Sequence, residues 1–178
     1  MRAPDPRPNR TRQALTAALL ELLAEKRWEK IRVQDILDRS GIGRSTFYAH
    51  FNSKFDLLVA GIPNQLQPLA SSDQDVPDLL PLFRHAEEVQ PILRPLLSQA
   101  VFAEINDSFH RELRASWVDH LNKRGVSAEE AEFAAELLAA GFLATVKTWV
   151  LNKCQRPASE LCATYESYSA AIITEARI

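Results

Sequence analysis

The sequence contains only two cysteines among its 178 residues. Cys154 and Cys162 cannot form the disulfide framework of a secreted scaffold, and no histidine lies near them to complete a zinc site. We therefore expect structural thiols rather than a redox pair or metal ligands. The longest apolar run, 137–146, ends at Lys147, well short of the ~18 residues of a membrane span. These absences predict a soluble, cytoplasmic protein.

Motifs of common enzyme sites are also missing. The sequence has no G-x-S-x-G, H-E-x-x-H, P-loop or G-x-G-x-x-G pattern. His110 and His120 are ten residues apart, which places them on different faces of a continuous helix and disfavours a shared metal ion. The opening stretch MRAPDPRPNR is rich in Pro and Arg and lacks the apolar core of a secretory signal. We expect a flexible basic arm there, and no enzyme activity, cofactor or metal.

Charge is distributed unevenly along the chain, although the net charge is only −2. Residues 1–60 contain eleven Lys and Arg against seven Asp and Glu, whereas the remainder contains ten against sixteen. A basic segment followed by an acidic body is typical of a protein that presents only its first part to a polyanion. The sequence therefore predicts two domains, 1–60 and 61–178.

The first domain has the pattern of a helix-turn-helix. Apolar residues follow a helical stripe over 11–25, with Thr11 as a candidate cap, and a second short helix is predicted over 33–39. Gly41 fits a position of positive φ that ends this helix. The next helix, 44–51, begins only about four residues later, and such a tight turn sets two helices at a large angle.

The helix over 44–51 divides into an apolar and a polar side. Phe47 and Phe51 are one turn apart and are expected to point into the core. The remaining side is polar and free of carboxylates, as a surface in a DNA major groove requires. Ser53 and Asp56 predict a capping box that opens a fourth helix. The candidate DNA-binding residues are Arg44, Ser45, Thr46, Tyr48, His50 and Lys54.

The string VQDILDRSGIGRSTFYAHFNSKFDLL resembles the DNA-binding domain of the tetracycline-repressor (TetR) family. The resemblance covers 11–58 and has two departures. Arg32 stands where such sequences usually have a Thr or Ser cap, and Gly43 stands where Ser is common. The resemblance implies an all-α fold of about nine helices, in which a three-helix DNA-binding domain precedes a ligand-binding and dimerisation domain.

Side-chain chemistry assigns roles within the candidate DNA surface. Arg44 can donate two hydrogen bonds to guanine O6 and N7, and Thr46 can contact a thymine methyl or a phosphate, with Ser45 a weaker candidate for either. The side chains of Tyr48, His50 and Lys54 are expected to donate to phosphates. The arm that carries Arg7, Arg10 and Arg12 either follows the DNA backbone, enters the minor groove or stays solvated.

Further helices are expected after a linker or mobile loop over 64–77. Pro91, Gly125 and Pro157 divide this part, and the predicted helices are 78–90, 91–102, 104–124, 127–153 and 158–176. The helix over 127–153 is apolar around nearly its whole circumference, so it needs partners on two sides. Burial within a monomer satisfies this pattern, as does a homodimer.

The resemblance favours the homodimer, in which the last two helices form a four-helix bundle with their symmetry mates. The candidate interface residues are Ala135, Leu138, Ala139, Phe142, Val146, Leu161, Tyr165, Tyr168 and Ile172. The candidate effector-binding residues, which equally suit a core, are Phe83, His85, Phe102, Phe109, Trp117, Phe142 and Trp149, with Arg94 as a further polar anchor.

Together these features predict a repressor that binds double-stranded, palindromic operator DNA as a dimer. By resemblance, a small apolar or aromatic effector would shift the fourth helix, change the distance between the two DNA-binding heads and release the operator. One alternative is a ligand-independent regulator or activator whose second domain binds a protein partner. Another is an all-helical enzyme or adaptor that never contacts DNA.

Overall fold

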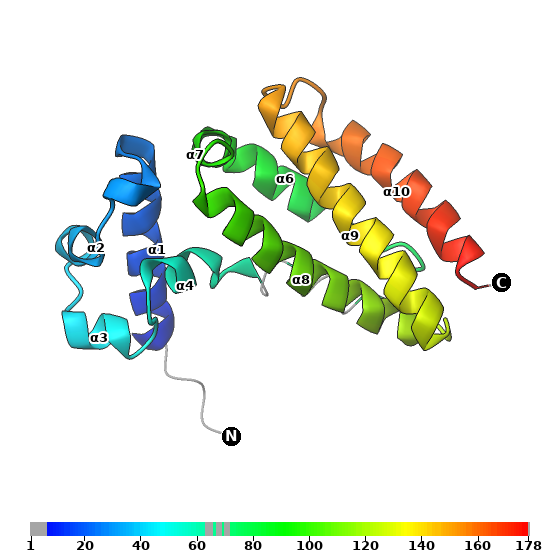
Figure 1. Cartoon of the computed structure of the whole chain (residues 1–178), viewed down its shortest axis with the longest axis horizontal. Helices are drawn as coiled ribbons and strands as arrows, with labels where there is room; N and C mark the ends of the chain where they lie inside the picture. Colours follow the sequence, from blue (N-terminus) through cyan, green and yellow to red (C-terminus); the bar gives the residue numbers. More distant parts are fainter. Residues whose placement is uncertain (1–6, 63–65, 67–68, 70–71, 178) are drawn as a thin grey trace. The chain divides into compact units, whose positions relative to one another are not determined.

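The computed structural model describes residues 7–62, 66, 69 and 72–177, with side chains from Arg10 onward. The chain divides into two compact units, Met1–Gly61 and Ile62–Ile178. The described residues form nine α-helices and one short 3-10 helix and include no strand, which confirms the predicted all-helical fold (Figure 1). The assignment of a function to each unit stays a prediction.

The first unit packs its helices around a small apolar core. The elements are α1 (Arg7–Glu25), the 3-10 helix Trp28–Lys30, α2 (Val33–Ser40), α3 (Arg44–Tyr48) and α4 (Lys54–Val59). Helix α1 contacts both α2 and α4. The core side chains, each at most 5% exposed, include Leu15, Leu19, Leu22, Ile36, Leu37, Phe47, Phe51 and Leu57.

Helix α1 begins earlier than the sequence suggested. It starts at Arg7 and not at Thr11, so 7–10 belong to the helix and not to an arm. Pro8 is compatible with a first helical turn because the N–H it lacks would have no partner there. Residues 1–6 of the expected arm lie outside the described residues.

Local chemistry fixes the α2–turn–α3 segment. Arg32 precedes α2 and lacks an acceptor in its side chain, but Asp35 accepts a hydrogen bond from its backbone N–H at 2.7 Å. At the other end Gly41 has φ 69°, and its N–H donates to the Leu37 carbonyl at 2.9 Å. Gly43 is extended and caps α3, and the Ser53 hydroxyl accepts from the Asp56 N–H to open α4, as predicted.

The second unit consists of five described helices. They are α6 (Leu80–Glu88), α7 (Gln90–Leu96), α8 (Val101–Asn122), α9 (Ala128–Leu151) and α10 (Ala158–Glu175). Helix α9 lies between α8 and α10, and α6 contacts both α9 and α10 (Figure 1). The predicted helix over 91–102 ends at Leu96 instead, where the side chains of Ser98 and Gln99 both donate to the Pro95 carbonyl and compete with helical bonding.

The described residues of the segment expected to be a linker or mobile loop include buried and hydrogen-bonded ones. Ile62, Leu66 and Leu69 have helical backbone and buried side chains, at the spacing of one helix face. Farther along, Arg124 donates to the carbonyls of Ser72 and Gln74, and the Asp75 carboxylate pairs with Arg177. The remaining residues of 63–71 lie outside the described part.

Helix α9 is long and apolar enough to cross a membrane by length and composition, although its longest uninterrupted apolar run is only 137–146. Its buried side contacts α8, α6 and α10, which identifies it as a core helix of this unit. Phe142 on this helix contacts the ring of Phe83 edge-on, with centroids 5.0 Å apart, and Tyr165 at 5.6 Å. The same aromatic cluster includes Trp149 and, stacked on Phe142, Phe109.

Candidate DNA-binding surface

Helix α3 separates a buried apolar side from an exposed polar side. The Phe47 ring is fully buried, and the Phe51 ring beyond the helix is 5% exposed. Their centroids are 5.8 Å apart, so the pair anchors α3 to the core. The exposed side contains Arg44, Ser45, Thr46 and Tyr48, while His50, two residues beyond the helix, is half-buried. Five of the six predicted DNA-binding residues are thus on α3 or the turn that follows it.

Arg44 is held by a neighbour on α2. Its Nη2 donates to Gln34 Oε1 at 2.7 Å, and Gln34 Nε2 in turn donates to Asp38 Oδ1 at 2.7 Å. All three side chains are at the surface. Sequence reasoning missed this chain of hydrogen bonds because Gln34 and Asp38 are ordinary residues for the exposed side of a short helix.

Lys54, the sixth candidate, has a structural role that its sequence position did not reveal. Its ammonium donates to the carbonyls of Trp28 and Ile31, each at 2.7 Å, and lies 4.2 Å from the centre of the Trp28 ring. Burial lowers the pKa of Lys54, while the nearby carboxylates of Glu29 and Asp35 act in the opposite direction. Two of the three N–H donors are therefore used within the protein, and the phosphate contact stays a prediction.

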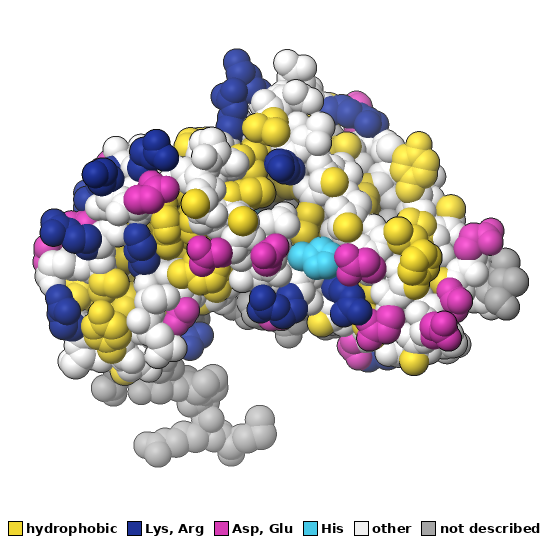
Figure 2. Space-filling view, viewed as in Figure 1, with side chains coloured by type: hydrophobic (Ala, Val, Ile, Leu, Met, Phe, Trp, Pro, Cys, Tyr) yellow, Lys and Arg dark blue, Asp and Glu magenta, His cyan; other side chains and the backbone are white. Residues whose placement is uncertain are grey.

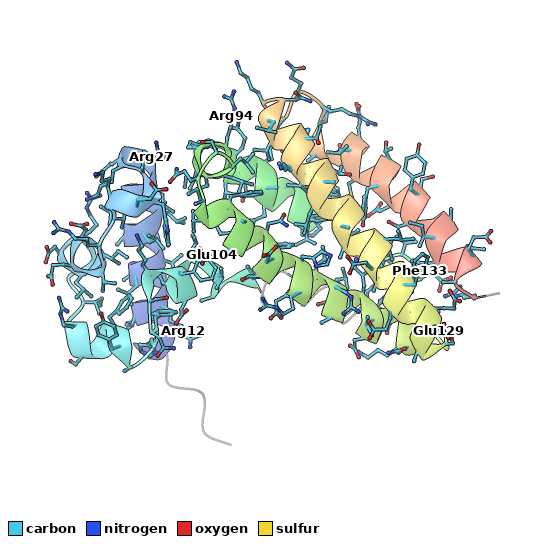
Figure 3. The ribbon with its side chains drawn as sticks, viewed as in Figure 1. Arg12, Arg27, Arg94, Glu104, Glu129 and Phe133 are labelled. Atoms are coloured by element: carbon cyan, nitrogen blue, oxygen red, sulfur yellow. The ribbon has the colours of Figure 1, made fainter. Side chains whose placement is uncertain are left out.

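Basic side chains are spread over this unit. On the face shown in Figure 2, Lys and Arg side chains are frequent over the first unit, and several Asp and Glu side chains lie over the second. Arg12, labelled on α1 in Figure 3, lies 5.7 Å from the centre of the Phe51 ring. Arg39 is less available to DNA because it pairs with Glu25 at 2.8 Å and Glu21 at 3.1 Å.

Burial within the single chain divides the predicted dimer-interface residues into two groups, and the interface itself stays a prediction. Six of its residues are at most 9% exposed within the single chain, so they form the protomer's own core: Ala135, Leu138, Ala139, Phe142, Val146 and Tyr165. The Tyr165 hydroxyl even donates to the Leu138 carbonyl inside that core. Leu161, Tyr168 and Ile172 remain at least partly accessible. The sequence correctly indicated that α9 is apolar on all sides but did not show which side faces inward.

An accessible apolar stripe lies on the other side of α9. Phe133 is 65% exposed and Leu137 is 46% exposed. The exposed Ala140 and Ala144 continue the stripe at helical spacing. Phe133 is labelled near the start of α9 in Figure 3. On α10, Tyr168 is 69% exposed and is accompanied by Ala171 and Ile172.

The predicted effector-binding residues are mostly core residues. Phe83, Trp117, Phe142 and Trp149 are buried, whereas His85, Phe102 and Phe109 are half-buried. Arg94 is exposed and lines a depression of about 370 Å³ together with Gln90, Pro91 and Pro95. Among the described side chains, Trp117 Nε1 is buried without a hydrogen-bond partner. These positions do not converge on one described cavity, so the effector site stays a prediction.

The two histidines considered as metal ligands have separate surroundings. His110 pairs with Glu136 at 3.1 Å, and the buried His120 lies 3.1 Å from the Asp75 carbonyl. A trio not anticipated from the sequence is formed by Asp78, Cys162 and Glu166, whose potential ligand atoms lie within 4.8 Å of one another. Burial raises the pKa of the Cys162 thiol, which donates a hydrogen bond to Glu166.

A short helix, a glycine turn and a second helix with an exposed polar face define a helix-turn-helix motif. Residues 15–60 match the family of bacterial regulatory proteins known as tetR. Over 55 residues the chain is 47% identical to an uncharacterised HTH-type transcriptional regulator, YxbF of Bacillus subtilis, a match that covers 30% of this chain and 14% of that protein.

Solved structures extend the likeness to nearly the whole chain. A TetR transcriptional regulator from Streptococcus agalactiae is 26% identical, with a TM-score of 0.61 over 92% of this chain and 95% of that one. The dihydroxyacetone kinase operon activator DhaS shares the fold at 20% identity, with a TM-score of 0.64 over 93% and 97%. A TetR-family regulator from Syntrophomonas wolfei does so at 18% identity, with a TM-score of 0.68 over 93% and 96%. Residues 15–60 therefore resemble the tetR family of bacterial regulatory proteins, and nearly the whole chain shares the fold of a TetR transcriptional regulator.

Proposed function

We propose that this protein is a transcriptional regulator that binds a near-palindromic operator as a homodimer. The observation that carries the proposal is the exposed, carboxylate-free face of α3, within a segment that matches the tetR family. In this arrangement the α3 helices of two protomers enter successive major grooves about one helical turn apart. Arg44 reads a base edge, and Tyr48 and His50 contact phosphates.

Dimerisation rests on the exposed stripes of α9 and α10. A monomer would expose Phe133, Leu137 and Tyr168 to water on neighbouring helices, and a two-fold pairing of these helices removes that apolar surface. The revised interface consists of Phe133, Leu137, Ala140, Ala144, Leu161, Tyr168, Ala171 and Ile172.

In this proposal the protein represses transcription in the cytoplasm, and a small apolar or aromatic effector relieves the repression. Occupancy of an operator is sufficient to block transcription, and a coupling of about 1–3 kcal/mol between effector and DNA changes affinity about 5- to 150-fold. The second candidate is an activator, since DhaS, which shares the fold, is described as one. The family consists of regulatory proteins, which supports the expectation that the chain is not an enzyme.

The test begins with selection of duplexes from a random-sequence library by the wild-type chain. The proposal predicts a palindromic consensus bound by two chains. Arg44→Ala is then expected to lose about 1–3 kcal/mol of binding free energy and to relax preference at one base position in each half-site. An equal loss on selected and random duplexes would make Arg44 a phosphate contact, and no enrichment of any sequence would contradict operator binding.

A further inference from the structure

The hydrogen bonds around Arg44 cross the turn between the two helices of the DNA-binding motif. Gln34 and Asp38 are one turn apart on α2, and Arg44 is the first residue of α3. The turn between them is fixed by Gly41 in a left-handed conformation. The series Asp38–Gln34–Arg44 therefore links the surface of α2 to the guanidinium that is expected to read DNA.

The chemistry of the three groups permits only one direction for this series. A carboxylate only accepts hydrogen bonds, so Asp38 selects the NH₂ end of the Gln34 amide. The carbonyl end of that amide is then left for Arg44, whose guanidinium only donates. The Gln34 amide is thus oriented at both ends and not free to flip.

Arg44 retains enough donors for a base. A guanidinium has five N–H groups, and the contact with Gln34 uses Nη2. Pairing with guanine O6 and N7 needs two donors with a fixed orientation of the guanidinium plane. In the free protein a long exposed side chain otherwise samples many rotamers, and holding it in one reduces the entropy lost on binding.

We propose that Gln34, oriented by Asp38, is a positioning residue that aims Arg44 at its base and so sets base discrimination at that site. The inference rests on the proposed function and adds a residue of α2 to the specificity of α3. When DNA binds over this surface, water is removed from around the Asp38–Gln34–Arg44 hydrogen bonds. These bonds are therefore stronger in the complex than in the free protein.

The test measures discrimination and not affinity alone. The probe is the duplex selected by the wild-type chain, together with variants of it substituted one base pair at a time. Gln34→Ala is expected to reduce discrimination about three- to tenfold at the same base pair that Arg44→Ala affects, with affinity for random duplex unchanged. Asp38→Asn, which allows the Gln34 amide to flip, is expected to have a smaller effect at that base pair. Gln155→Ala, an exposed glutamine in the second unit, is the matched control and is expected to change nothing.

A double-variant cycle separates positioning from direct contact. When Arg44 is already alanine, Gln34→Ala is expected to have no further effect on discrimination. A further loss at any base pair would mean that Gln34 reads DNA itself, and an equal loss on random duplex would make it a phosphate contact. Unchanged discrimination in Gln34→Ala, with circular dichroism showing intact helices, would also overturn the inference. A wild-type chain that selects no sequence would instead contradict the proposed function.

Discussion

The Lys54 side chain shows how one residue can serve the fold at the edge of a binding surface. Its ammonium joins the start of α4 to the carbonyls that follow α1, at Trp28 and Ile31. The sequence predicted a phosphate contact for Lys54 but not that two of its donors are directed inward. A carbonyl pair that accepts from a lysine far along the chain leaves no pattern in the sequence, so only tertiary structure reveals it.

Replacing Lys54 with alanine is therefore expected to destabilise the protein as well as to weaken DNA binding. Two carbonyls lose a charged donor, so the free energy of unfolding should fall by about 1–3 kcal/mol in urea titrations. Lys30→Ala, at an exposed position on the neighbouring 3-10 helix, is the control and should change it little. An unfolding free energy equal to that of the wild type would contradict the structural role. If the third N–H also contacts a phosphate, the slope of log affinity against log salt should become shallower by about one.

His120 gives the molecule a pH-dependent stability. Burial lowers the pKa of His120 and outweighs the backbone contact with Asp75, and the Arg124 cation also lowers it. Unfolding returns the pKa to about 6.5, so below that pH the unfolded chain binds a proton that the folded chain resists. Stability should therefore fall as the pH drops from about 6.5 toward the lower folded pKa.

The corresponding experiment compares unfolding free energies of the wild type and His120→Gln between pH 7.5 and 5. The wild type should lose stability over this interval more steeply than the variant, because the variant lacks the titrating group while the other three histidines are unchanged. His120→Asn serves as a second variant if the glutamine does not fit. Parallel pH profiles for the wild type and the variants would show that His120 does not carry the effect.

At the scale of helices, sequence periodicity predicted most elements but not their orientation. The expected helices over 104–124, 127–153 and 158–176 correspond closely to α8, α9 and α10 because each is long and bounded by glycine or proline. Along α9 apolar residues occur on every side, so periodicity cannot distinguish Ala139, which faces the core, from Ala140, which does not. The phase of the helix is set by packing against α8, α6 and α10.

The adjacent residues Ala139 and Ala140 provide a matched test of the dimer interface. Ala140→Arg places a charge on the exposed stripe, so it should leave helix content unchanged and produce a monomer near 20.0 kDa. Ala139→Arg places the same charge at a fully buried position and should lower the melting temperature sharply, because the described buried side chains include no carboxylate to pair with it. Circular dichroism and sedimentation velocity give both readouts. A folded Ala140→Arg protein that remains dimeric would show that the stripe is not the interface.

The expected linker or loop over 64–77 shows where composition misled. Its Gln, Ser, Asp and Pro content is typical of a linker, yet Leu66 and Leu69 within it and Ile62 before it are buried, and Arg124 donates to the carbonyls of Ser72 and Gln74. Three apolar residues separated by polar ones give a weak helical signal over so short a length. Arg124, which donates to the Ser72 carbonyl, is 52 residues from Ser72 in the sequence, so the local sequence gives no sign of this contact.

For the whole molecule, the charge division and the helix-turn-helix motif were predictable, whereas the effector was not. The basic excess within residues 1–60 and the polar face of α3 belong to one unit, and the acidic excess belongs to the other. An effector site depends on the shape enclosed by several helices, and the predicted aromatic residues lie mainly in a packed cluster. Chemistry that depends on adjacent residues is therefore easier to predict than chemistry that depends on a cavity.

The central claim is that two chains bind one operator through α3. Its most direct test is a fluorescence anisotropy titration of the selected duplex with wild-type protein at several salt concentrations, at duplex concentrations both below and above the dissociation constant. The account predicts saturation at two chains per duplex, affinity that falls steeply with salt, and at least about a thousandfold preference over a scrambled duplex. Equal binding of the selected and scrambled duplexes, or no salt-dependent binding at all, would contradict it.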